Sequence, residues 1–235
     1  MTHLYLIRHG ESFANVAPIV GGMRGDKGLT PRGVTQAERL RDRLAASGEL
    51  QADVLIASTL PRARQTAEII APALDLPIVF DDAVQELRPG IADGLTLDQL
   101  RERYGRVDFE ADPYRPLSPG GESWAFFLVR VATALTHIAT EHAGQTIVIV
   151  CHGGVIDGSF QCFAGMNLVT ARAVDFATEN TSITHWQWRA AHGRPPRWRL
   201  MGYNDAAHLR GAPDEESSSR SHPAVPLDDE AEESG

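Results

Sequence analysis

Hydrophobic and polar positions follow two patterns over the first 210 residues. Four short apolar runs, at residues 4–7, 54–57, 78–80 and 147–150, have the length and composition of parallel strands buried on both faces. Between these runs, apolar residues recur every three or four positions, which predicts helices. Because strands and helices alternate, we expect a three-layer α/β/α sandwich with a mostly parallel central sheet.

Local signals set the ends of the predicted helices. Thr30 followed by Pro31 is a typical N-cap and first-turn pair, and Gly48 is a typical stop. Thr96 and Gln99 have the spacing of a capping box, which predicts a short helix after them. The clearest helical face comes later and consists of Trp124, Phe127, Leu128, Val131, Leu135 and Ile138.

The last part of the chain contains two further sequence patterns. Residues 182–189 and 197–203 alternate apolar and polar positions, which predicts an antiparallel strand pair joined by a turn at residues 193–196. Residues 211–235 are rich in serine, proline and acidic residues and have few large apolar ones, which predicts disorder. We therefore expect one domain over residues 1–210, followed by a disordered acidic tail.

The distribution of charge changes which partners the sequence allows. Eight acids and one arginine give the tail a net charge of −7 out of −9 for the whole chain, so residues 1–210 carry only −2. Such a domain is compatible with an anionic substrate, but we expect no nucleic-acid or membrane partner. Two cysteines cannot form a disulfide framework, and no apolar run resembles a secretory signal or a membrane span. The expected location is the cytoplasm, and the oligomeric state stays open.

Polar side chains follow three of the predicted strands at the points where they end. Arg8 and His9 follow the first strand. Arg62 comes shortly after the second, and His152 and Gly153 follow the fourth. The carboxyl ends of parallel strands meet at one edge, which is where open α/β sheets bind their ligands. Arginines, histidines and a glycine-rich helix start together favour an anion, and phosphate fits best.

The segment "LIRHGESFAN" resembles the signature of the histidine phosphatase superfamily, which includes the cofactor-dependent phosphoglycerate mutases and many phosphatases. Further pieces agree in order and spacing: "GLTPRGVTQAERL", "ASTLPRARQTAEII", "QELRPG", "PGGESW", "VIVCHGGV", "ENTSIT" and "YNDAAHL". The tripeptide "RHG" alone is a weak signal, but the ordered set covers about residues 3–209. The resemblance implies a phosphoglycerate mutase-like fold.

The resemblance also implies a role for each candidate residue. His9 is the expected nucleophile that becomes phosphorylated, and Glu86 is the expected general acid. The phosphoryl group would be held by Arg8, Asn15, Arg62, His152 and the backbone of Gly153. Hydrolysis of a phosphate monoester needs charge stabilisation on three equatorial oxygens, and attack by an imidazole divides it into two steps. We expect a small phosphorylated substrate, no cofactor and no metal.

Some assignments stay open in the sequence. Asp81, Asp82 and Asp93 lie close enough to Glu86 along the chain to compete for the acid role. Two serines near the motifs either contact the ligand or support and cap local structure; they are Ser12 and Ser58. The segment "HIATEH" does not have the H-E-x-x-H spacing of a zinc site, so it gives no reason to expect a metal.

The length and composition of residues 88–119 help to distinguish a phosphatase from a mutase. This stretch is shorter than the insertion with which the mutases grip phosphoglycerate, and its prolines predict a stiff lid. This lid and the first loop offer cations and aromatic side chains whose direction the sequence does not give: Arg24, Lys27, Arg88, Arg101, Arg103, Arg106, Arg115, Tyr104, Phe109 and Tyr114. We therefore favour a phosphatase over a mutase.

Three other functions compete with the phosphatase. A mutase shares all the motifs and differs in the fate of the phosphoryl group. A catalytically inactive, phosphate-binding relative is disfavoured because the complete candidate set is present. A nucleotide-binding regulatory protein is disfavoured because the chain has neither G-x-G-x-x-G nor G-x-x-x-x-G-K-[ST].

Overall fold

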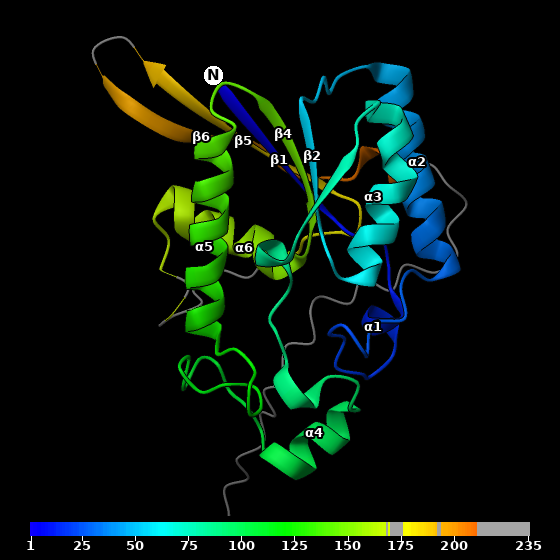
Figure 1. Cartoon of the computed structure of the whole chain (residues 1–235), viewed down its shortest axis with the longest axis vertical. Helices are drawn as coiled ribbons and strands as arrows, with labels where there is room; N and C mark the ends of the chain where they lie inside the picture. Colours follow the sequence, from blue (N-terminus) through cyan, green and yellow to red (C-terminus); the bar gives the residue numbers. More distant parts are fainter. Residues whose placement is uncertain (168, 170–175, 192–193, 211–235) are drawn as a thin grey trace, which may run out of the picture.

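The computed structural model describes residues 1–167, 169, 176–191 and 194–210, so the predicted acidic tail lies outside the described residues. Within them, a six-stranded sheet forms the centre of the molecule, with the strand order β3-β2-β4-β1-β5-β6 (Figure 1). The strands are β1 (Thr2–Arg8), β2 (Val54–Ser58), β3 (Ile78–Asp81), β4 (Thr146–Cys151), β5 (Ile183–Ala191) and β6 (Arg194–Asp205).

The sheet is mostly parallel, as predicted. β1, β4, β2 and β3 run in the same direction, whereas β5 and β6 are each antiparallel to the strand before them in the sheet. Arg8 at the end of β1 pairs with Cys151 at the end of β4. Ala57, one residue before the end of β2, pairs with Val150. The carboxyl ends of β1, β2 and β4 are therefore level, and the residues that follow them meet at one edge.

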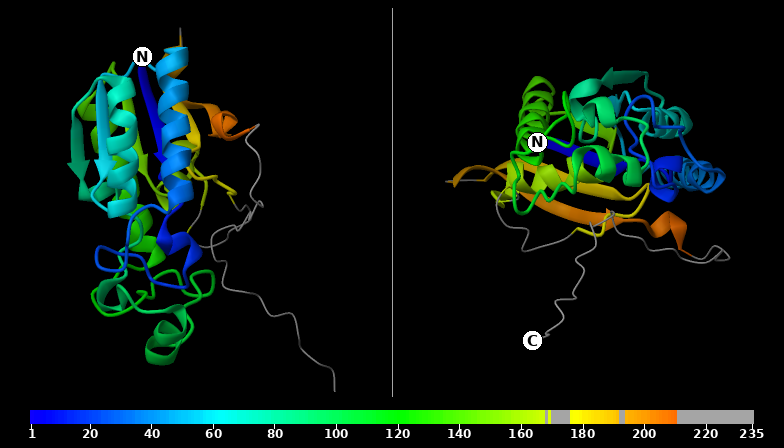
Figure 2. Two further views of the ribbon diagram at one scale, coloured as in Figure 1. Left: turned by 90° about the vertical axis from the view of Figure 1, so that its right-hand side faces the viewer. Right: turned by 90° about the horizontal axis from the view of Figure 1, so that it is seen from below.

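Helices cover both faces of the sheet, which makes the predicted three-layer sandwich. On one face lie α2 (Pro31–Ser47) and α3 (Pro61–Leu74), and on the other lie α5 (Trp124–Glu141) and α6 (Gly153–Ala164) (Figures 1 and 2). The short helices α1 (Phe13–Val16) and α4 (Leu97–Tyr104) lie beyond the carboxyl edge of the sheet (Figure 1). Single turns of 3-10 helix occur at Asp82–Val84, Gly90–Ala92 and Ala207–Leu209.

Two apolar clusters, one on each face of the sheet, hold the layers together. Phe127 of α5 is fully buried in one cluster with Leu4 and Leu6 of β1. Ile7 of the same strand belongs to the other cluster, together with Leu40 of α2. Side chains of β1 thus enter both clusters, as expected of a strand covered on both sides. Burial of each of these side chains contributes roughly 1.5–3 kcal/mol to stability.

The predicted helix ends are confirmed. The Thr30 hydroxyl accepts the Gly33 N–H at 3.1 Å, and Gly48 follows α2 with a φ of 58°, in the left-handed region that glycine adopts readily. Thr96 and Gln99 form a reciprocal capping box at the start of α4, with hydrogen bonds of 3.1 and 3.0 Å. These local signals fix the helix starts without tertiary context.

One strand differs from the prediction. β3 is an edge of the sheet and is not buried on both faces, since Val79 and Phe80 are 54% and 37% exposed. The guanidinium of Arg64 lies 4.4 Å from the centre of the Phe80 ring. The prediction of burial on both faces was wrong because an apolar run does not tell an edge strand from a central one, which depends on pairing with distant segments.

The predicted antiparallel pair is present, with one change at its turn. β6 already begins at Arg194, so Pro195 belongs to the strand and not to the turn. A proline is tolerated there because β6 lies at an edge of the sheet. No helix in the described part of the chain is long and apolar enough to cross a membrane.

Candidate active site

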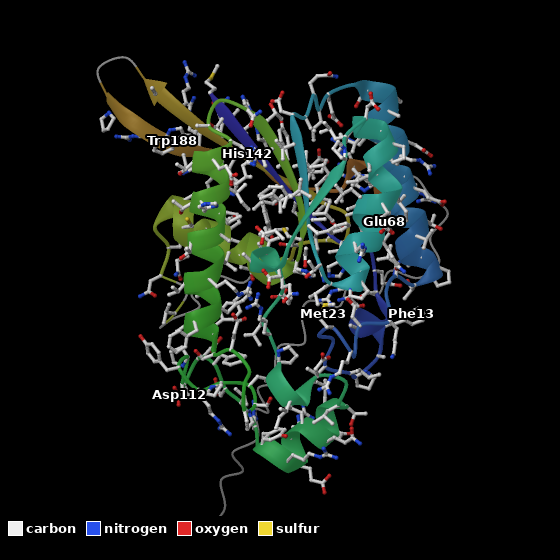
Figure 3. All side chains as sticks on the ribbon, in the orientation of Figure 1. Phe13, Met23, Glu68, Asp112, His142 and Trp188 are labelled. Carbon is white, nitrogen blue, oxygen red and sulfur yellow. The ribbon has the colours of Figure 1, made fainter. Side chains whose placement is uncertain are left out.

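The candidate residues gather where the level ends of β1, β2 and β4 meet. His9 directly follows β1, Arg62 lies in the first turn of α3, and His152 is the N-cap of α6. The side chains of Met23 and Phe13 lie near this edge of the molecule, whereas His142 and Trp188 lie toward the opposite end (Figure 3). The strand order places β2, β4 and β1 side by side, and this brings together residues that are far apart in the sequence.

His9 is held as one tautomer. Its side chain is buried, and its Nδ1 lies 2.6 Å from the carbonyl oxygen of Gly10. A carbonyl only accepts hydrogen bonds, so Nδ1 carries the ring proton. The Nε2 atom accepts a hydrogen bond from Nε of Arg62 at 3.0 Å. His9 therefore presents an unprotonated nitrogen toward a cationic group, which is the state a nucleophilic imidazole needs.

The backbone around His9 is in close contact with three distant segments of the chain. Gly10 donates its N–H to the Thr66 hydroxyl at 3.0 Å, and a side chain at Gly10 would meet the Gly33 carbonyl oxygen at 2.5 Å. The His9 carbonyl accepts the Asn180 side-chain amide at 2.9 Å and the Thr181 N–H at 3.3 Å. The motif "ENTSIT" thus supports the backbone of the candidate nucleophile, a role that sequence reasoning missed.

Thr181 has an unusual backbone conformation. Its φ of 57° lies in the left-handed region, which is rare for a β-branched residue and costs on the order of 1–3 kcal/mol. Its side chain is fully buried, with a hydroxyl that donates to the Asn180 carbonyl at 2.7 Å and contacts His208 at 2.9 Å. The strain is thus maintained beside the end of β1, at the backbone of the candidate nucleophile.

Arg62 is oriented by a carboxylate that sequence reasoning also missed. Its Nη1 donates to Oδ2 of Asp26 at 2.8 Å and to the Gly21 carbonyl at 2.9 Å. Asp26 also accepts the backbone N–H of Arg62 at 3.1 Å, and the side chains are 5% and 0% exposed. Asp26 has no sequence signal beyond its place in a glycine-rich loop. This buried ion pair leaves Nε of Arg62 directed at His9.

Arg8 is the second arginine of the site. Its Nη1 donates to the carbonyl oxygen of Thr178. Burial lowers the pKa of Arg8, and the nearby carboxylate of Glu86 opposes this shift. The guanidinium stays charged near neutral pH because its ordinary pKa is so high. Its Nε atom is buried and has no hydrogen-bond partner among the described residues, so a donor is available.

His152 is fully buried beside His9, with 5.2 Å between the two ring centres. Its Nε2 lies 2.8 Å from the hydroxyl oxygen of Ser58. Burial lowers the pKa of His152 well below 6.5, and the positive charges of Arg62 and Arg8 lower it further, so the ring is neutral near pH 7. Its Nδ1 is buried and has no hydrogen-bond partner within the described part of the chain.

Glu86 lies at the N-terminal end of α6. Oε2 accepts the Gly154 N–H at 3.0 Å, and Oε1 accepts the Leu87 N–H at 3.0 Å. A side chain at position 154 would lie 2.4 Å from Oε1, so the glycine is what lets the carboxylate approach. A carboxyl group is therefore available at the rim of the cluster, on the helix end that stabilises negative charge.

The segment that carries Glu86 is clamped from α5. Arg130 donates to the carbonyls of Ala83 and Gln85 at 2.9 Å each and to that of Glu86 at 3.2 Å. The same guanidinium forms two hydrogen bonds with Glu122, at 2.6 and 2.7 Å. Burial raises the pKa of Glu122, but Arg130 outweighs it and the pKa is lowered overall. Sequence reasoning did not identify this clamp.

The three competing acids lie in other contacts. Asp81 accepts the Ala83 N–H at 2.8 Å, and Asp82 forms an ion pair of 3.1 Å with Arg88. Asp93 accepts backbone N–H groups of the loop that leads to Asp26, at 2.8 to 2.9 Å, from Gly22, Arg24 and Gly25. None of these three contacts involves the N-terminal end of α6, where the Glu86 carboxylate accepts the Gly154 N–H.

Ser12, the N-cap of α1, and Asn15, the third residue of this helix, form a cap. The side-chain oxygen of Asn15 accepts both the N–H and the hydroxyl of Ser12 at 3.0 Å. The hydroxyl of Ser12 is buried and engaged in this cap, so it supports local structure. The oxygen of Asn15 is engaged in this cap, and its amide nitrogen is the part that suits a phosphoryl oxygen.

Cations of the lid segment, residues 88–119, bind groups of the protein itself. Arg88 bonds Asp82 and Gln85, and Arg115 bonds the carbonyls of Tyr104 and Arg106. In the first loop, Arg24 lies against Asp93 and Lys27 against the Arg24 carbonyl. Arg101 forms an ion pair of 3.7 Å with Asp98. These contacts occupy several of the cations that the sequence offered for a second anion.

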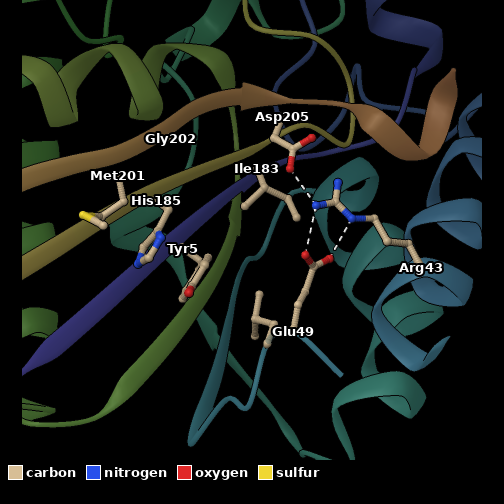
Figure 4. A pocket seen from close by; sticks show the side chains of 9 residues that line it. Tyr5, Arg43, Glu49, Ile183, His185, Met201, Gly202 and Asp205 are labelled. Atoms are coloured by element: carbon tan, nitrogen blue, oxygen red, sulfur yellow. Dashed lines mark hydrogen bonds and ion pairs between the residues drawn. The ribbon is translucent and has the colours of Figure 1, made fainter. Parts of the chain in front are cut away.

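A separate cavity of about 230 Å³ lies between β1, β5, β6 and the end of α2 (Figure 4). Arg43 bridges Glu49 and Asp205 at its rim, with distances of 2.7 and 2.6 Å. Tyr5 and His185 stack with 4.0 Å between their ring centres. None of the sequence-predicted site residues lines this cavity, so it does not belong to the His9 site.

Acidification is expected to weaken the fold through His185. Burial, and then the charge of His3, lowers the pKa of His185 from 6.5 to about 4. The unfolded chain therefore takes up a proton at this residue before the folded chain does. The free energy of unfolding should fall as the pH drops from 6.5 to about 4, and the whole contribution of His185 is lost below that range.

Urea unfolding at about pH 7.5 and about pH 5 measures this loss. The His185→Gln variant should show a smaller difference between the two conditions than the native chain. His137→Gln is a matched control, because His137 is 75% exposed and contacts only Glu141 among the ion pairs described. An equal pH difference in all three proteins would contradict the role of His185.

Comparisons with known proteins place the chain among the phosphatases, which are phosphoric monoester hydrolases. A sequence model described as histidine phosphatase superfamily (branch 1) matches residues 4–202. The chain therefore belongs to the histidine phosphatase superfamily. The resemblance stated from the motifs is confirmed, and with it the phosphoglycerate mutase-like α/β fold.

Three relatives illustrate the range within the superfamily. The probable phosphoglycerate mutase GpmB of Yersinia pestis (strain Pestoides F) is 28% identical over 211 residues, which cover 89% of this chain and 95% of the relative. The solved structure of Bacillus stearothermophilus YhfR is 29% identical, with a TM-score of 0.73 and coverage of 88% and 99%. A phosphoserine phosphatase from Entamoeba histolytica, solved with 3-phosphoglyceric acid, is 28% identical, with a TM-score of 0.69 and coverage of 89% and 100%.

Proposed function

We propose that this protein hydrolyses phosphate monoesters of small metabolites through a phosphohistidine on His9. The observation that carries the proposal is the tautomer of His9: Nδ1–H is bound to the Gly10 carbonyl, and the unprotonated Nε2 faces Arg62. In the reaction, Nε2 attacks phosphorus and the bond to the ester oxygen breaks. Water then hydrolyses the phosphohistidine and releases inorganic phosphate.

The phosphoryl oxygens are held by donors that surround His9. Arg8 and Arg62 supply two buried guanidinium groups, and each charge-assisted hydrogen bond contributes roughly 1.5–3 kcal/mol. His152, the amide nitrogen of Asn15 and the N–H of Gly153 complete the set. Gly153 is the first residue of α6, where backbone N–H groups have no partner within the helix. Arg8 and Arg62 supply the positive charge that a metal ion would otherwise supply, so activity should persist in EDTA.

Glu86 is the proposed general acid for the leaving oxygen. Its carboxylate lies beside the phosphoryl donors but is not one of them, because it accepts the backbone N–H groups of Gly154 and Leu87. A carboxyl group inside the phosphoryl pocket would repel the substrate, whereas one at the rim can give a proton to the departing alkoxide. The competing acids Asp81, Asp82 and Asp93 are held in other contacts.

Hydrolysis is favoured over phosphoryl transfer between two hydroxyls of phosphoglycerate. A mutase needs a cationic grip on the substrate carboxylate, and Arg24, Arg88 and Arg115 are bound to groups of the protein. The relatives support both interpretations, since a phosphoserine phosphatase shares the fold while GpmB is named a probable phosphoglycerate mutase. Mutase activity is therefore the second candidate.

One assay distinguishes the two candidates. The purified protein is incubated with a panel of phosphorylated metabolites, including phosphoserine and 2- and 3-phosphoglycerate, and the release of phosphate and the interconversion of phosphoglycerates are both measured. Net release from several monoesters is the expected result. Interconversion of the phosphoglycerates without release would establish the mutase, and neither activity would support an inactive, phosphate-binding protein.

We also propose how the rest of the chain relates to this activity. Residues 1–210 would form the complete catalytic domain, and the acidic segment 211–235 would be an appendage outside it. The chain has only two cysteines, both free, which suits the reducing cytoplasm. A small phosphorylated metabolite is the proposed partner.

Loss of Asp26 is expected to weaken phosphoryl binding although Asp26 does not touch the ligand. Asp26→Asn removes the charge that holds Nη1 of Arg62, so the guanidinium is no longer fixed toward His9. Inhibition by vanadate, a mimic of the transferred phosphoryl group, should weaken by about ten- to a hundred-fold. Removing one partner of a buried ion pair should also lower the stability by roughly 3–5 kcal/mol.

Vanadate inhibition is measured under conditions in which the variant is folded. Asp42→Asn is the control, because Asp42 forms an exposed ion pair with Arg41 and should change neither property. Unchanged vanadate affinity in folded Asp26→Asn would show that Arg62 does not depend on this carboxylate.

A further inference from the structure

Ser58 contacts His152 from the end of β2. It is the last residue of β2 and is fully buried. Its hydroxyl oxygen accepts the N–H of Leu60 at 3.3 Å and lies 2.8 Å from Nε2 of His152. His152 in turn has a buried Nδ1 without a hydrogen-bond partner in the described parts of the chain. Whether Nδ1 of His152 donates a hydrogen bond to a ligand or accepts one depends on which ring nitrogen carries the proton.

The hydrogen-bonding capacity of Ser58 selects the tautomer of His152. A backbone N–H can only donate, so the contact with Leu60 uses a lone pair of the hydroxyl and leaves its proton free. His152 is the other polar contact of this hydroxyl among the described residues, so the proton goes to Nε2. A neutral imidazole has one donor and one acceptor, and the ring proton then lies on Nδ1.

The opposite tautomer is disfavoured for two reasons. With the proton on Nε2, Ser58 would accept twice, and its own hydroxyl proton would be buried without an acceptor, which costs roughly 1–3 kcal/mol. In addition, Nδ1 would turn a lone pair toward any anion bound beside Arg8 and Arg62. Lone pairs repel phosphoryl oxygens, whereas an N–H group binds them.

We propose that Ser58 is a positioning residue that fixes His152 as the Nδ1–H tautomer, so that His152 acts as a neutral, fixed hydrogen-bond donor to a phosphoryl oxygen. The ring then neither accepts a proton from the substrate nor supplies a positive charge. The ligand part of this inference rests on the proposed function, but the tautomer itself does not. A ligand oxygen also accepts a hydrogen bond from the buried Nδ1–H of His152, which has no other partner among the described residues. This hydrogen bond favours the binding of an oxyanion.

The tautomer is tested by nitrogen NMR of the protein labelled in its histidine rings. The native protein, in the absence of ligand, should show protonated Nδ1 and unprotonated Nε2 for His152, with the signal assigned through its loss in His152→Gln. Ser58→Ala should shift the ring toward the Nε2–H form or a mixture. Ser159→Ala is the matched control, because Ser159 is also fully buried and its hydroxyl binds the Ile156 carbonyl and Trp186. Protonated Nε2 in the native protein would overturn the inference.

Vanadate affinity tests whether the Nδ1–H tautomer of His152 contributes to anion binding. Ser58→Ala should weaken vanadate binding by about ten-fold, and Ser58→Thr, which keeps the hydroxyl, should restore it. At position 152, asparagine places its amide NH₂ close to where Nδ1 lies, whereas glutamine reaches toward Nε2. His152→Asn should therefore retain more affinity than His152→Gln. Equal affinities in these two variants, or an unaffected Ser58→Ala, would count against the donor role.

The two measurements separate this inference from the proposed function. A protein with the Nδ1–H tautomer and the predicted vanadate pattern, but without hydrolysis of any monoester, would support the inference and refute the phosphatase. A protein that hydrolyses monoesters while His152 carries its proton on Nε2 would refute the inference and leave the phosphatase standing. Thermal unfolding of each variant shows whether a loss of affinity comes from a loss of folded protein.

Discussion

Replacement of His9 by alanine is expected to lower turnover of phosphate monoesters by roughly 10⁴- to 10⁶-fold, the range seen when a catalytic nucleophile is removed. The variant should also form no covalent phosphoenzyme. The reason lies in the orientation of the ring, since the Gly10 carbonyl holds the proton on Nδ1 and leaves Nε2 as the attacking atom. Alanine preserves Arg8 and Arg62, so vanadate and phosphate should still bind, although more weakly.

The phosphoenzyme is detected by mixing enzyme with substrate, stopping the reaction within milliseconds in alkali, and locating the added mass by peptide mass spectrometry. A phosphohistidine survives alkali and is lost in acid, whereas phosphoserine survives acid. His137→Ala is the control for a histidine outside the site, because His137 is exposed on α5. Phosphate on Ser12 or Ser58, or a phosphoenzyme in the His9→Ala variant, would remove His9 from the nucleophile role.

The sequence predicted the elements of the fold well because their signals are local. The apolar run before Arg8, the cap at Thr30 and the one-sided apolar face that includes Phe127 each depend on residues within a few positions of one another. All three predictions are confirmed. β3 was predicted incorrectly as fully buried, because its place at the edge depends on which strand it pairs with.

In the candidate site, too, local sequence signals predicted some residues, whereas residues that act through contacts with distant segments were missed. The motifs placed His9, Arg62 and His152 at strand ends, and the level register of the strands brings them together. The residues that hold them in position were not predictable. Asp26 reaches Arg62 across 36 positions, and Arg130 reaches the backbone of Glu86 across 44. Such contacts leave no periodicity or spacing in the sequence, since they arise only when the loops and α5 are in place.

The replacement Glu86→Gln is expected to slow the hydrolysis of alkyl phosphates by about 10²- to 10⁴-fold, the usual contribution of a general acid. Glutamine keeps the size of the side chain and one acceptor for the Gly154 N–H, but it has no proton to transfer. An alkoxide such as that of glycerol is a poor leaving group and needs this proton. The p-nitrophenolate ion leaves almost unaided, so p-nitrophenyl phosphate should be affected far less.

This comparison requires the step that releases the leaving group to be measured alone. Breakdown of the phosphohistidine is common to both substrates and would hide the difference in steady-state rates, so single-turnover release of glycerol and of p-nitrophenol is the appropriate measurement. Asp81→Asn and Asp93→Asn are the comparison variants. Asp93 binds the backbone of the loop that leads to Asp26, so its loss should slow both substrates by the same factor. Equal losses for both substrates in Glu86→Gln would remove Glu86 from the acid role, and a loss that depends on the leaving group only in an aspartate variant would assign that role to the aspartate.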